Sequence, residues 1–412
     1  MSRSRPLLTP QYMRQFKCVG SQCEDTCCIG WRVNIDHATY RKYRRVTDPE
    51  LRQELDSCIK RNRSQPGEQN YARIKMNRGN ACPLLNEDSL CRIQLRLGEE
   101  FLSDVCATYP RISNLVNNVL EKSGTMSCPE TARLALLNPD EMEFDELTEP
   151  IETRNIINRR IDTHGLAVAR SAKRYFWELR IFTIQVLQNR NYTLAERLII
   201  LGMFYHGIQN QIDAGQVEEI PRIIARFTNL LAGNELRADL AAIPTQVTIQ
   251  LQLMKELADE RVVAGVSTRI YLECFDQFLH GVQYVPEATV EEVAARYQEA
   301  EETCYRPFMT GREYILENYL VNYVFKNLFP FSGEKNLFDN YIMMVVHYAL
   351  IKMHLIGIGA FHRGLTEEMV IKLIYSFARA VEHSPKYLQH VLKLLKDNGF
   401  NTMAYMAILI KN

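Results

Sequence analysis

Cysteine is the residue type whose number and placement in this 412-residue chain most clearly indicate chemistry. Nine of the eleven cysteines lie at or before Cys128, and only Cys274 and Cys304 follow it. The first ten residues carry charge with no apolar segment behind them, so we interpret the protein as cytoplasmic. Because a reducing compartment does not sustain structural disulfides, clustered thiols there indicate metal ligation. The first third of the chain is therefore predicted to bind a metal.

Eight of the early cysteines fall into two groups that could supply thiolates to metal centres. In the first group, short loops with Gly20 and Gly30 permit the tight backbone that converging sulfur atoms need. Its two adjacent cysteines are expected to point apart, so that one faces a second centre or the outer shell. In the second group the ligands arrive singly, and two precede proline, which favours an extended approach. The candidate ligands are Cys18, Cys23, Cys27 and Cys28, followed by Cys82, Cys91, Cys106 and Cys128.

The ligand type alone does not separate an iron–sulfur cluster from zinc, since both accept four thiolates. Structural zinc sites usually contain paired Cys-x-x-Cys knuckles, and none occurs in this sequence. The spacing therefore favours an iron–sulfur cluster, with zinc or mononuclear iron as the alternative. Cys58, Cys274 and Cys304 stand alone and are interpreted as small core residues.

The elements that position these cysteines differ along the chain. Residues 1–138 are interrupted every few residues by cysteine, proline and turn signals, which predicts an irregular cysteine-rich, metal-binding module. Within it, the segment 86–89 is expected to form the turn of a hairpin that links Cys82 to Cys91. An acidic, proline-punctuated stretch, 139–152, is interpreted as a linker. Residues 153–412 are predicted to form a multi-helix bundle, so the fold class is mainly α.

Apolar residues recur at helical spacing through the second part, which predicts about seven to nine helices. Thr193 and Glu196 have the spacing of a capping box. The most apolar stretch, 341–361, contains His347, Lys352 and His354, and is interpreted as a buried core helix rather than a membrane span. Both histidines are interpreted as packing groups. The predicted helical ranges are 174–208, 217–231, 248–257, 289–305, 311–329, 337–356, 366–381 and 385–395.

Overall charge and glycine pattern exclude some functions. The chain has 49 basic and 49 acidic residues, whereas general binders of nucleic acid or anionic membranes normally carry a basic excess. We therefore expect neither a nucleic-acid partner nor membrane insertion. A dinucleotide-type fold would place a glycine-rich turn after a strand. Gly357 and Gly359 lie inside an apolar helical run, which favours helix packing over cofactor binding.

The cysteine-containing segments resemble those of the flagellin lysine-N-methylases, bacterial enzymes that methylate surface lysines of flagellin. Two of the segments that carry this resemblance are Cys23-Glu-Asp-Thr-Cys-Cys-Ile-Gly-Trp31 and Cys106-Ala-Thr-Tyr-Pro-Arg111. The resemblance is dense over residues 8–137 and extends to the helical remainder only in general character. The first part also resembles small cysteine-rich domains that are regarded as zinc- or iron-chelating.

The resemblance implies a protein-lysine N-methyltransferase that acts on flagellin. It also implies S-adenosylmethionine as methyl donor and an iron–sulfur cluster, of the 4Fe-4S type, whose four ligands come from the eight cysteines named above. Radical-type S-adenosylmethionine enzymes carry Cys-x-x-x-Cys-x-x-Cys. Here Cys23 and Cys27 satisfy the first interval, but Gly30 replaces the third cysteine, so a standard radical cleavage site is not supported.

Methylation of an amine requires a deprotonated lysine, a positioned donor and stabilisation of positive charge. Carboxylates and aromatic rings attract cations, and the first part holds several of both. The candidates for contact with donor or substrate are Asp25, Asp36, Tyr40, Asp104 and Tyr109, together with Trp31 and Arg111 for the donor. The alternative function is a non-enzymatic metal-binding or redox-sensing interaction protein, in which the same residues are structural.

Overall fold

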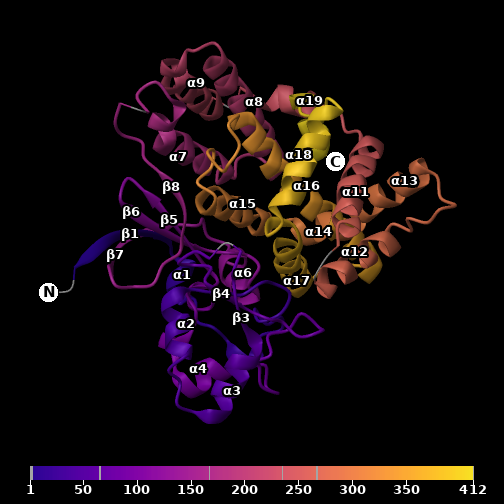
Figure 1. Ribbon diagram of the computed structural model, residues 1–412. Helices are drawn as coiled ribbons and strands as arrows, with labels where there is room; N and C mark the ends of the chain where they lie inside the picture. The colour runs from indigo at the N-terminus through magenta and orange to yellow at the C-terminus, as the bar shows by residue number, and fades with distance from the viewer. Residues whose placement is uncertain (1–2, 65, 167, 234, 266–267, 412) are drawn as a thin grey trace.

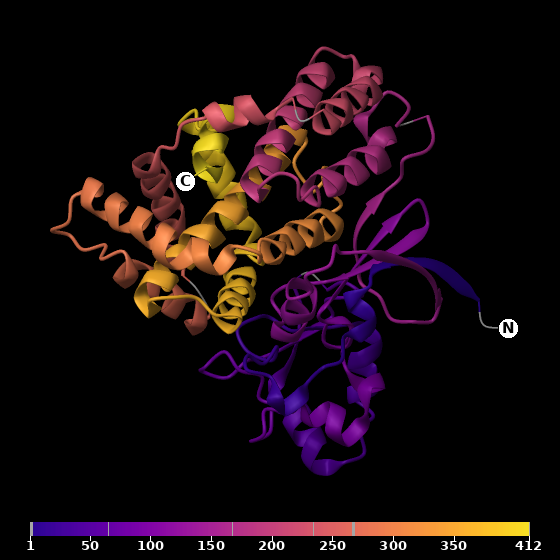
Figure 2. The same ribbon diagram turned by 180° about the vertical axis from the view of Figure 1, so that it is seen from behind.

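The computed structural model describes residues 3–64, 66–166, 168–233, 235–265 and 268–411. The N-terminal module forms the lower end of the molecule in Figure 1, a five-stranded sheet lies above it, and helices fill the rest. The view from behind in Figure 2 shows the same division. The prediction of a mainly α fold is confirmed.

The larger sheet is an element that the sequence reasoning missed. Its strands follow the order β7-β1-β6-β5-β8, in which β1 pairs with β6 and β5 with β8 in parallel, and the other pairs are antiparallel. Asn117 and Asn118 join β5 to β6 and both have positive φ, which is the geometry of a tight two-residue hairpin. The strands are β1 (Ser4–Pro10), β5 (Arg111–Val116), β6 (Val119–Gly124), β7 (Phe144–Pro150) and β8 (Ile157–Ile161).

The stretch 139–152, predicted to be an acidic linker, contains a strand instead. β7 pairs along its whole length with β1, from Ser4 opposite Pro150 to Pro10 opposite Phe144. Its Glu149 meets basic partners on β6 and β1, because it contacts Lys122 and lies 3.1 Å from Arg5. The acidic residues that suggested a linker therefore lie on an edge strand of the sheet, and one of them, Glu149, pairs with Arg5 of the adjacent strand β1.

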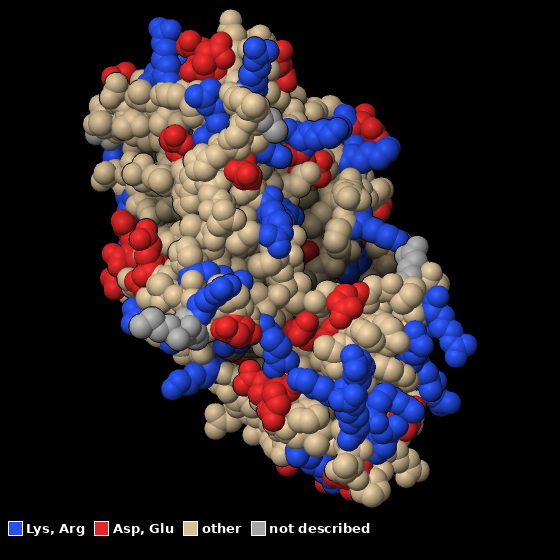
Figure 3. Space-filling model, turned by 60° about the vertical axis from the view of Figure 1, so that its left-hand side comes forward, with Lys and Arg blue, Asp and Glu red and all other residues tan. Residues whose placement is uncertain are grey.

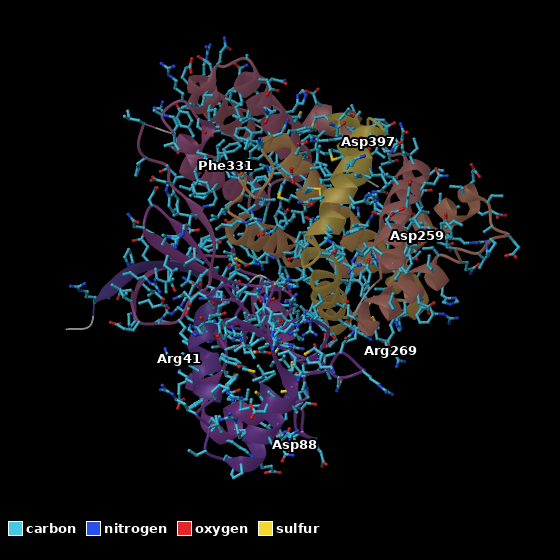
Figure 4. All side chains as sticks on the ribbon, viewed as in Figure 1. Arg41, Asp88, Asp259, Arg269, Phe331 and Asp397 are labelled. Carbon is cyan, nitrogen blue, oxygen red and sulfur yellow. The ribbon has the colours of Figure 1, made fainter. Side chains whose placement is uncertain are left out.

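The N-terminal module has a small core of its own. A three-stranded sheet in the order β2-β4-β3 packs with short helices around buried residues that include Ile35, Leu51 and Cys82. Arg41 and Asp88 lie in this module, at the opposite end of the molecule from Asp397 (Figure 4). Its elements are α1 (Tyr12–Gln15), η1 (Gly20–Gln22), β2 (Asn34–Ile35), α2 (His37–Tyr43), α3 (Pro49–Cys58), β3 (Ile59–Arg61), β4 (Ala72–Ile74), α4 (Arg92–Leu97), η2 (Glu99–Phe101), α5 (Asp104–Thr108) and α6 (Pro129–Leu136).

The helical part contains a helix in every range that the periodicity predicted, and it also contains α10, α12, α14 and α19, which were not predicted. Thr193 and Glu196 form the predicted capping box at the start of α8. The helices are η3 (Ala172–Tyr175), α7 (Phe176–Leu187), α8 (Leu194–Asp213), η4 (Val217–Glu219), α9 (Ile220–Ala232), α10 (Arg237–Ala242), α11 (Val247–Val263), α12 (Arg269–Gly281), α13 (Val290–Ala300), the π-helix η5 (Glu301–Tyr305), α14 (Arg306–Met309), α15 (Tyr314–Lys326), α16 (Leu337–His362), α17 (Glu367–Phe377), the π-helix η6 (Ala378–Glu382), α18 (Pro385–Asp397) and α19 (Met403–Ile410).

The long helix α16 runs through the centre of this part (Figure 1). Among the described residues it alone is long and apolar enough to cross a membrane, but its apolar window is entirely buried inside the protein. The prediction of a buried core helix is therefore confirmed.

Gly357 serves packing, as its helical context predicted. A Cβ on Gly357 would lie 2.5 Å from the Phe278 ring, and one on Gly281 would lie 1.9 Å from the Gly357 carbonyl oxygen. The two glycines thus allow α12 and α16 to approach closely, as small residues do where helix backbones meet.

The sheet is joined to the helices through buried polar contacts. Arg180 of α7 donates to both carboxylate oxygens of Glu121 on β6, at 2.8 and 2.7 Å. The Tyr12 hydroxyl donates to Asn322 of α15 at 2.6 Å, and the Asn114 amide donates to the Lys326 carbonyl at 2.8 Å. These contacts fix the N-terminal part against the helical part.

Candidate functional site

The two cysteine groups are brought together by backbone pairing between two distant loops. Ile29 forms an antiparallel bridge with Ala81, and the Gly30 amide donates to the Asn80 carbonyl at 2.9 Å. The Cys82 amide then donates to the Cys28 carbonyl at 2.8 Å. Gly30 has φ +88°, so glycine meets the requirement for a tight loop that the sequence indicated.

Short helices present two cysteines of the second group. Cys91 and Cys128 occupy the N-cap positions of α4 and α6. Burial raises the pKa of each thiol, and backbone N–H groups of the following helix turn partly oppose this shift. A helix N-terminus favours a thiolate over a thiol, because its dipole carries partial positive charge. The expected turn is confirmed as well, since the Asn86 amide donates to the Leu90 carbonyl at 2.9 Å across the segment 86–89.

Cys27 lies at the electrostatic centre of the candidate ligands. Burial is the largest cause of the raised pKa of five other thiols, and the proximity of Cys27 raises each of them further. Burial and neighbouring cysteines raise the pKa of Cys23 and Cys82 to about 11, and that of Cys106 to about 12. Cys18 is exposed, and it lies near enough to Cys23 to contribute to the raised pKa of Cys23. The five thiols whose pKa is raised by the nearby Cys27 are those of Cys23, Cys82, Cys91, Cys106 and Cys128.

Cys27 and Cys28 differ from the expectation that adjacent side chains point apart. Interaction with the Cys28 thiol, followed by burial, raises the pKa of Cys27 far above its usual range. The two thiols are therefore neighbours, since the loop between Thr26 and Gly30 turns tightly enough to bring them to one side.

The eight thiols share one region without having the geometry of a bound ion. All of them are free, and no group of three or more His, Cys, Asp or Glu side chains in the described part of the chain is spaced to hold a metal. Cys58 is buried beside Cys82 in the module's core, and Cys274 is buried within the helical core, as predicted. Cys304 is partly exposed rather than fully buried.

Arg379 of η6 is the functional candidate that sequence reasoning missed. Its guanidinium donates to the backbone carbonyls of Asp25 at 2.8 Å, Thr26 at 3.3 Å and Ser127 at 3.0 Å. It also forms an ion pair with the Asp25 carboxylate at 2.8 Å. One arginine from the helical part thus holds the loop before Cys27 and the residue before Cys128. No local pattern could reveal it, because 354 positions separate it from Asp25.

Three of the predicted lining residues gather around this arginine. Asp25 pairs with it, and the second carboxylate oxygen of Asp25 is buried without a hydrogen-bond partner among the described residues. The Tyr109 hydroxyl lies 3.2 Å from the Ser127 hydroxyl, and its ring packs 5.8 Å from that of Trp31. The Trp31 indole donates to the Cys27 carbonyl. Asp25, Trp31 and Tyr109 therefore surround the loop that carries Cys27.

The other candidates lie elsewhere in the module. Asp36 caps α2 and accepts from the Thr39 and Asp104 amides, at 2.7 and 3.1 Å. Burial and the nearby Asp36 raise the pKa of Asp104. Tyr40 packs edge-on against Tyr71, and Arg111 lies over the Phe16 ring. We assign Asp36 a capping role and Arg111 a packing role.

The surface of the module is strongly basic. Lysine and arginine side chains gather on the lower end of the molecule in the space-filling view (Figure 3). Two shallow hollows there are lined by Arg32, Lys60, Arg61, Arg63, Arg73 and Lys75.

Together these features define a class of mainly helical protein in which an arginine of the helical part secures a thiol-rich N-terminal module. No solved structure matches the chain. The model of the FliB lysine N-methylase C-terminal domain matches residues 180–409, more than half of the chain. The chain therefore belongs to the FliB lysine N-methylase family.

Curated relatives extend the similarity over both parts. The lysine-N-methylases of Salmonella typhimurium strain LT2 and Salmonella choleraesuis strain SC-B67 are each 26% identical over 386 residues, which is 91% of this chain and 91% of the relative. The flagellar biosynthetic protein FliU of Salmonella muenchen is 36% identical over 140 residues, which is 33% of this chain and 80% of that protein.

Proposed function

We propose that this protein is a cytoplasmic protein-lysine N-methyltransferase that transfers methyl groups from S-adenosylmethionine to lysines of flagellin. Membership of the FliB lysine N-methylase family carries the lysine methyltransferase part of this proposal. The flagellar name of the FliU relative supports a flagellar protein as substrate.

We further propose that the eight N-terminal cysteines bind an iron–sulfur cluster of the 4Fe-4S type. The donor set supports it, because eight free thiols share one region, and burial followed by repulsion from neighbouring cysteines raises the pKa of Cys23, Cys82 and Cys106. A cationic cluster offsets such repulsion, and it binds thiolates rather than thiols. Since the thiols are not spaced as ligands here, binding requires their side chains to rearrange.

The residues around Cys27 would hold the cluster loop and tune it. When bound, the cluster would supply iron and sulfide sites. Arg379 would hold the backbone next to Cys27 and Cys128 through the carbonyls of Asp25 and Ser127. Trp31 and Tyr109 would pack aromatic surface against the loop that carries Cys27.

Incubation of anaerobically purified protein with flagellin and S-adenosylmethionine tests the function. We expect flagellin peptides to gain methyl-sized mass increments on lysine, and the gain to require the donor. Iron and acid-labile sulfide are measured on the same preparation. Absence of lysine methylation by iron- and sulfide-loaded protein contradicts the methyltransferase proposal.

Alanine variants at the eight cysteine positions test the cluster separately. We expect loss of iron and sulfide in the variants that remove ligands, and no loss in Cys274→Ala, whose thiol is buried in the helical core. Stoichiometric zinc in a colourless protein contradicts the iron–sulfur assignment and leaves the methyltransferase proposal to the first experiment.

A further inference from the structure

A cavity of about 370 Å³ lies between the sheet and the helices α15, α16 and α18, next to the cysteine region. We call it the α15–α18 cavity. His383 on its wall is hydrogen-bonded to the hydroxyl of Ser127, at 2.9 Å, and Ser127 directly precedes Cys128. Phe331, which precedes the lining residue Ser332, lies on the side of α7 and the sheet (Figure 4). Because the cavity residue His383 contacts Ser127, the residue before Cys128, a molecule held in this cavity lies beside the cysteine region.

The cavity is lined by both apolar and polar side chains. Met343 and Leu388 line it together with Tyr323. Apolar groups of this kind suit an alkyl chain, because they remove apolar surface from water without offering hydrogen bonds. Among the polar lining residues, His347 and Glu382 lie close enough to interact electrostatically.

The tautomer of His347 leaves one ring nitrogen able to accept a proton. Its Nδ1 lies 2.6 Å from the Met343 carbonyl, which can only accept, so Nδ1 carries the proton and Nε2 has a free lone pair. No described residue hydrogen-bonds Nε2. Burial lowers the pKa of His347, and although Glu382 opposes this shift, Lys326 adds to it. The ring is consequently neutral near pH 7.

Glu382 can stabilise the imidazolium that such a base forms. Burial would raise the pKa of Glu382, but Lys326 and His347 lower it to about 2, so the carboxylate is charged. It contacts the Lys326 ammonium and accepts from the Tyr319 hydroxyl at 2.8 Å. The groups that face His347 are thus Glu382 from η6 and Lys326 and Tyr323 from α15, with Phe377 of α17 against its ring.

The cavity disfavours a second ammonium. Lys326 lies inside it, where its ammonium contacts Glu382, and the cationic Arg159 on its rim donates to the Asn327 carbonyl at 3.1 Å. Desolvation and like charges both lower the pKa of an amine, which is how a lysine becomes nucleophilic.

In the described part of the chain, a second cavity lacks a histidine beside an ionised carboxylate. It has a volume of about 420 Å³ and lies between α8, α14, α15 and α16. Its buried cations are paired, as Lys326 is, Lys352 with Glu301 at 3.3 Å and Arg197 with Glu317 at 2.7 Å. No histidine lines it among the described residues.

We propose that the α15–α18 cavity receives the side chain of the lysine to be methylated, and that Nε2 of His347 removes its proton. This inference rests on the proposed methyltransferase function. The N–H electron pair stays on nitrogen as the lone pair, and the proton forms the imidazolium beside Glu382. The lone pair then bonds to the methyl carbon of a sulfonium donor, whose C–S electron pair remains on sulfur. The product is a methylammonium, so atoms and charge balance.

The decisive variant is His347→Asn, since an asparagine amide keeps the donor to the Met343 carbonyl and removes only the base. We expect kcat at pH 7.5 to fall about 10²–10⁴-fold. The loss should shrink as pH approaches about 10, where solution deprotonates lysine. His354→Asn is the matched control, because His354 makes the same bond to Leu350 at 2.7 Å but is packed among the rings of Tyr271, Phe275 and Phe278. Wild-type rate and pH profile in folded His347→Asn overturn the proposal.

Two further measurements keep the test decisive. Arg159→Gln alters an exposed rim residue, and we expect it to move the acidic limb of the kcat profile to higher pH, because the bound amine loses a repelling charge. An unchanged limb contradicts a site for the amine in this cavity.

In wild type, n-butylamine should shift the NMR resonances of the His347 ring and leave those of His354 unchanged. If wild type does not methylate flagellin but butylamine shifts His347, the proposed function fails while the amine site stands. If wild type is active and butylamine leaves His347 unchanged, the cavity proposal fails alone.

Discussion

Arg379 is a single side chain that holds the loop at Asp25 and Thr26 in place from a distant part of the sequence. Its guanidinium has five N–H donors in a fixed plane, and it uses them on carbonyl groups of two separate loops and on one carboxylate. Lysine, as a point charge, could not bridge the Asp25 and Ser127 carbonyls in the same way.

Arg379→Ala should lower the free energy of unfolding by about 3–5 kcal/mol, because it leaves the partly buried Asp25 carboxylate without its counter-charge. Denaturant titration measures this loss. Arg222→Ala is the control, since the Arg222 side chain is 86% exposed and its ion pair with Glu219 is 3.5 Å long. Its effect should stay within about 0.5 kcal/mol. Equal effects of the two variants contradict the role given to Arg379.

Glu382 makes the free energy of unfolding depend on pH in the acidic range. Its pKa in the folded protein is about 2, below the ordinary 4.5, so its contribution is present above pH 4.5 and is lost as pH falls toward 2. The stability advantage of wild type over Glu382→Gln should therefore shrink by about 3 kcal/mol between pH 5 and pH 2. Urea denaturation at a series of pH values measures this. Glu218→Gln, at an exposed position, should show no comparable change, and a constant wild-type advantage would refute the assignment.

Residue-scale prediction from sequence succeeded where the signal was local. Gly20 and Gly30 have the positive φ that tight loops require, and the turn before Cys91 forms as expected. The pairing of Arg379 with Asp25 and the cavity position of His347 depend on tertiary structure. His347 and His354 both occur in the same apolar pattern of α16, but His347 lines the α15–α18 cavity whereas His354 is packed against aromatic rings.

At the scale of elements, the crossing of α12 and α16 depends on the absence of two side chains. Gly357→Ala should destabilise the protein by about 1–3 kcal/mol, because its Cβ would lie 2.8 Å from backbone atoms of Phe278. Gly207→Ala in α8 is the matched control, since no atom lies within 4 Å of its Cβ. That change should stabilise the helix by about 0.5–1 kcal/mol. Thermal unfolding of both variants checks this, and a stable Gly357→Ala contradicts the close approach.

Helices were predictable here and strands were not. The helices are long and periodic, whereas the sheet pairs β1 with strands more than a hundred residues away. One local signal was available, since Asn117-Asn118 lies between two apolar pairs, Leu115-Val116 and Val119-Leu120. The acidic strand β7 offered none, because its pairing depends on the basic residues of β1 and β6.

At the scale of the whole molecule, the two parts share a sheet and do not separate at the predicted boundary. A fragment of residues 1–138 lacks β7, β8 and Arg379, so we expect rapid proteolysis and reduced strand content by circular dichroism. A fragment of residues 1–165 regains both strands and should recover the strand signal, but its cysteine loops should remain sensitive to protease. Full protection of the shorter fragment would show that the module folds independently.

The contact between Arg379 and the loop at Asp25 also sets an order in time. A ribosome that adds about 5–20 residues per second makes Arg379 about 20–70 s after Asp25. Throughout that interval the nascent cysteine loops exist without the side chain that later fixes them. The loops are therefore not yet anchored while the chain is still being made, and they become fixed only after η6 is complete.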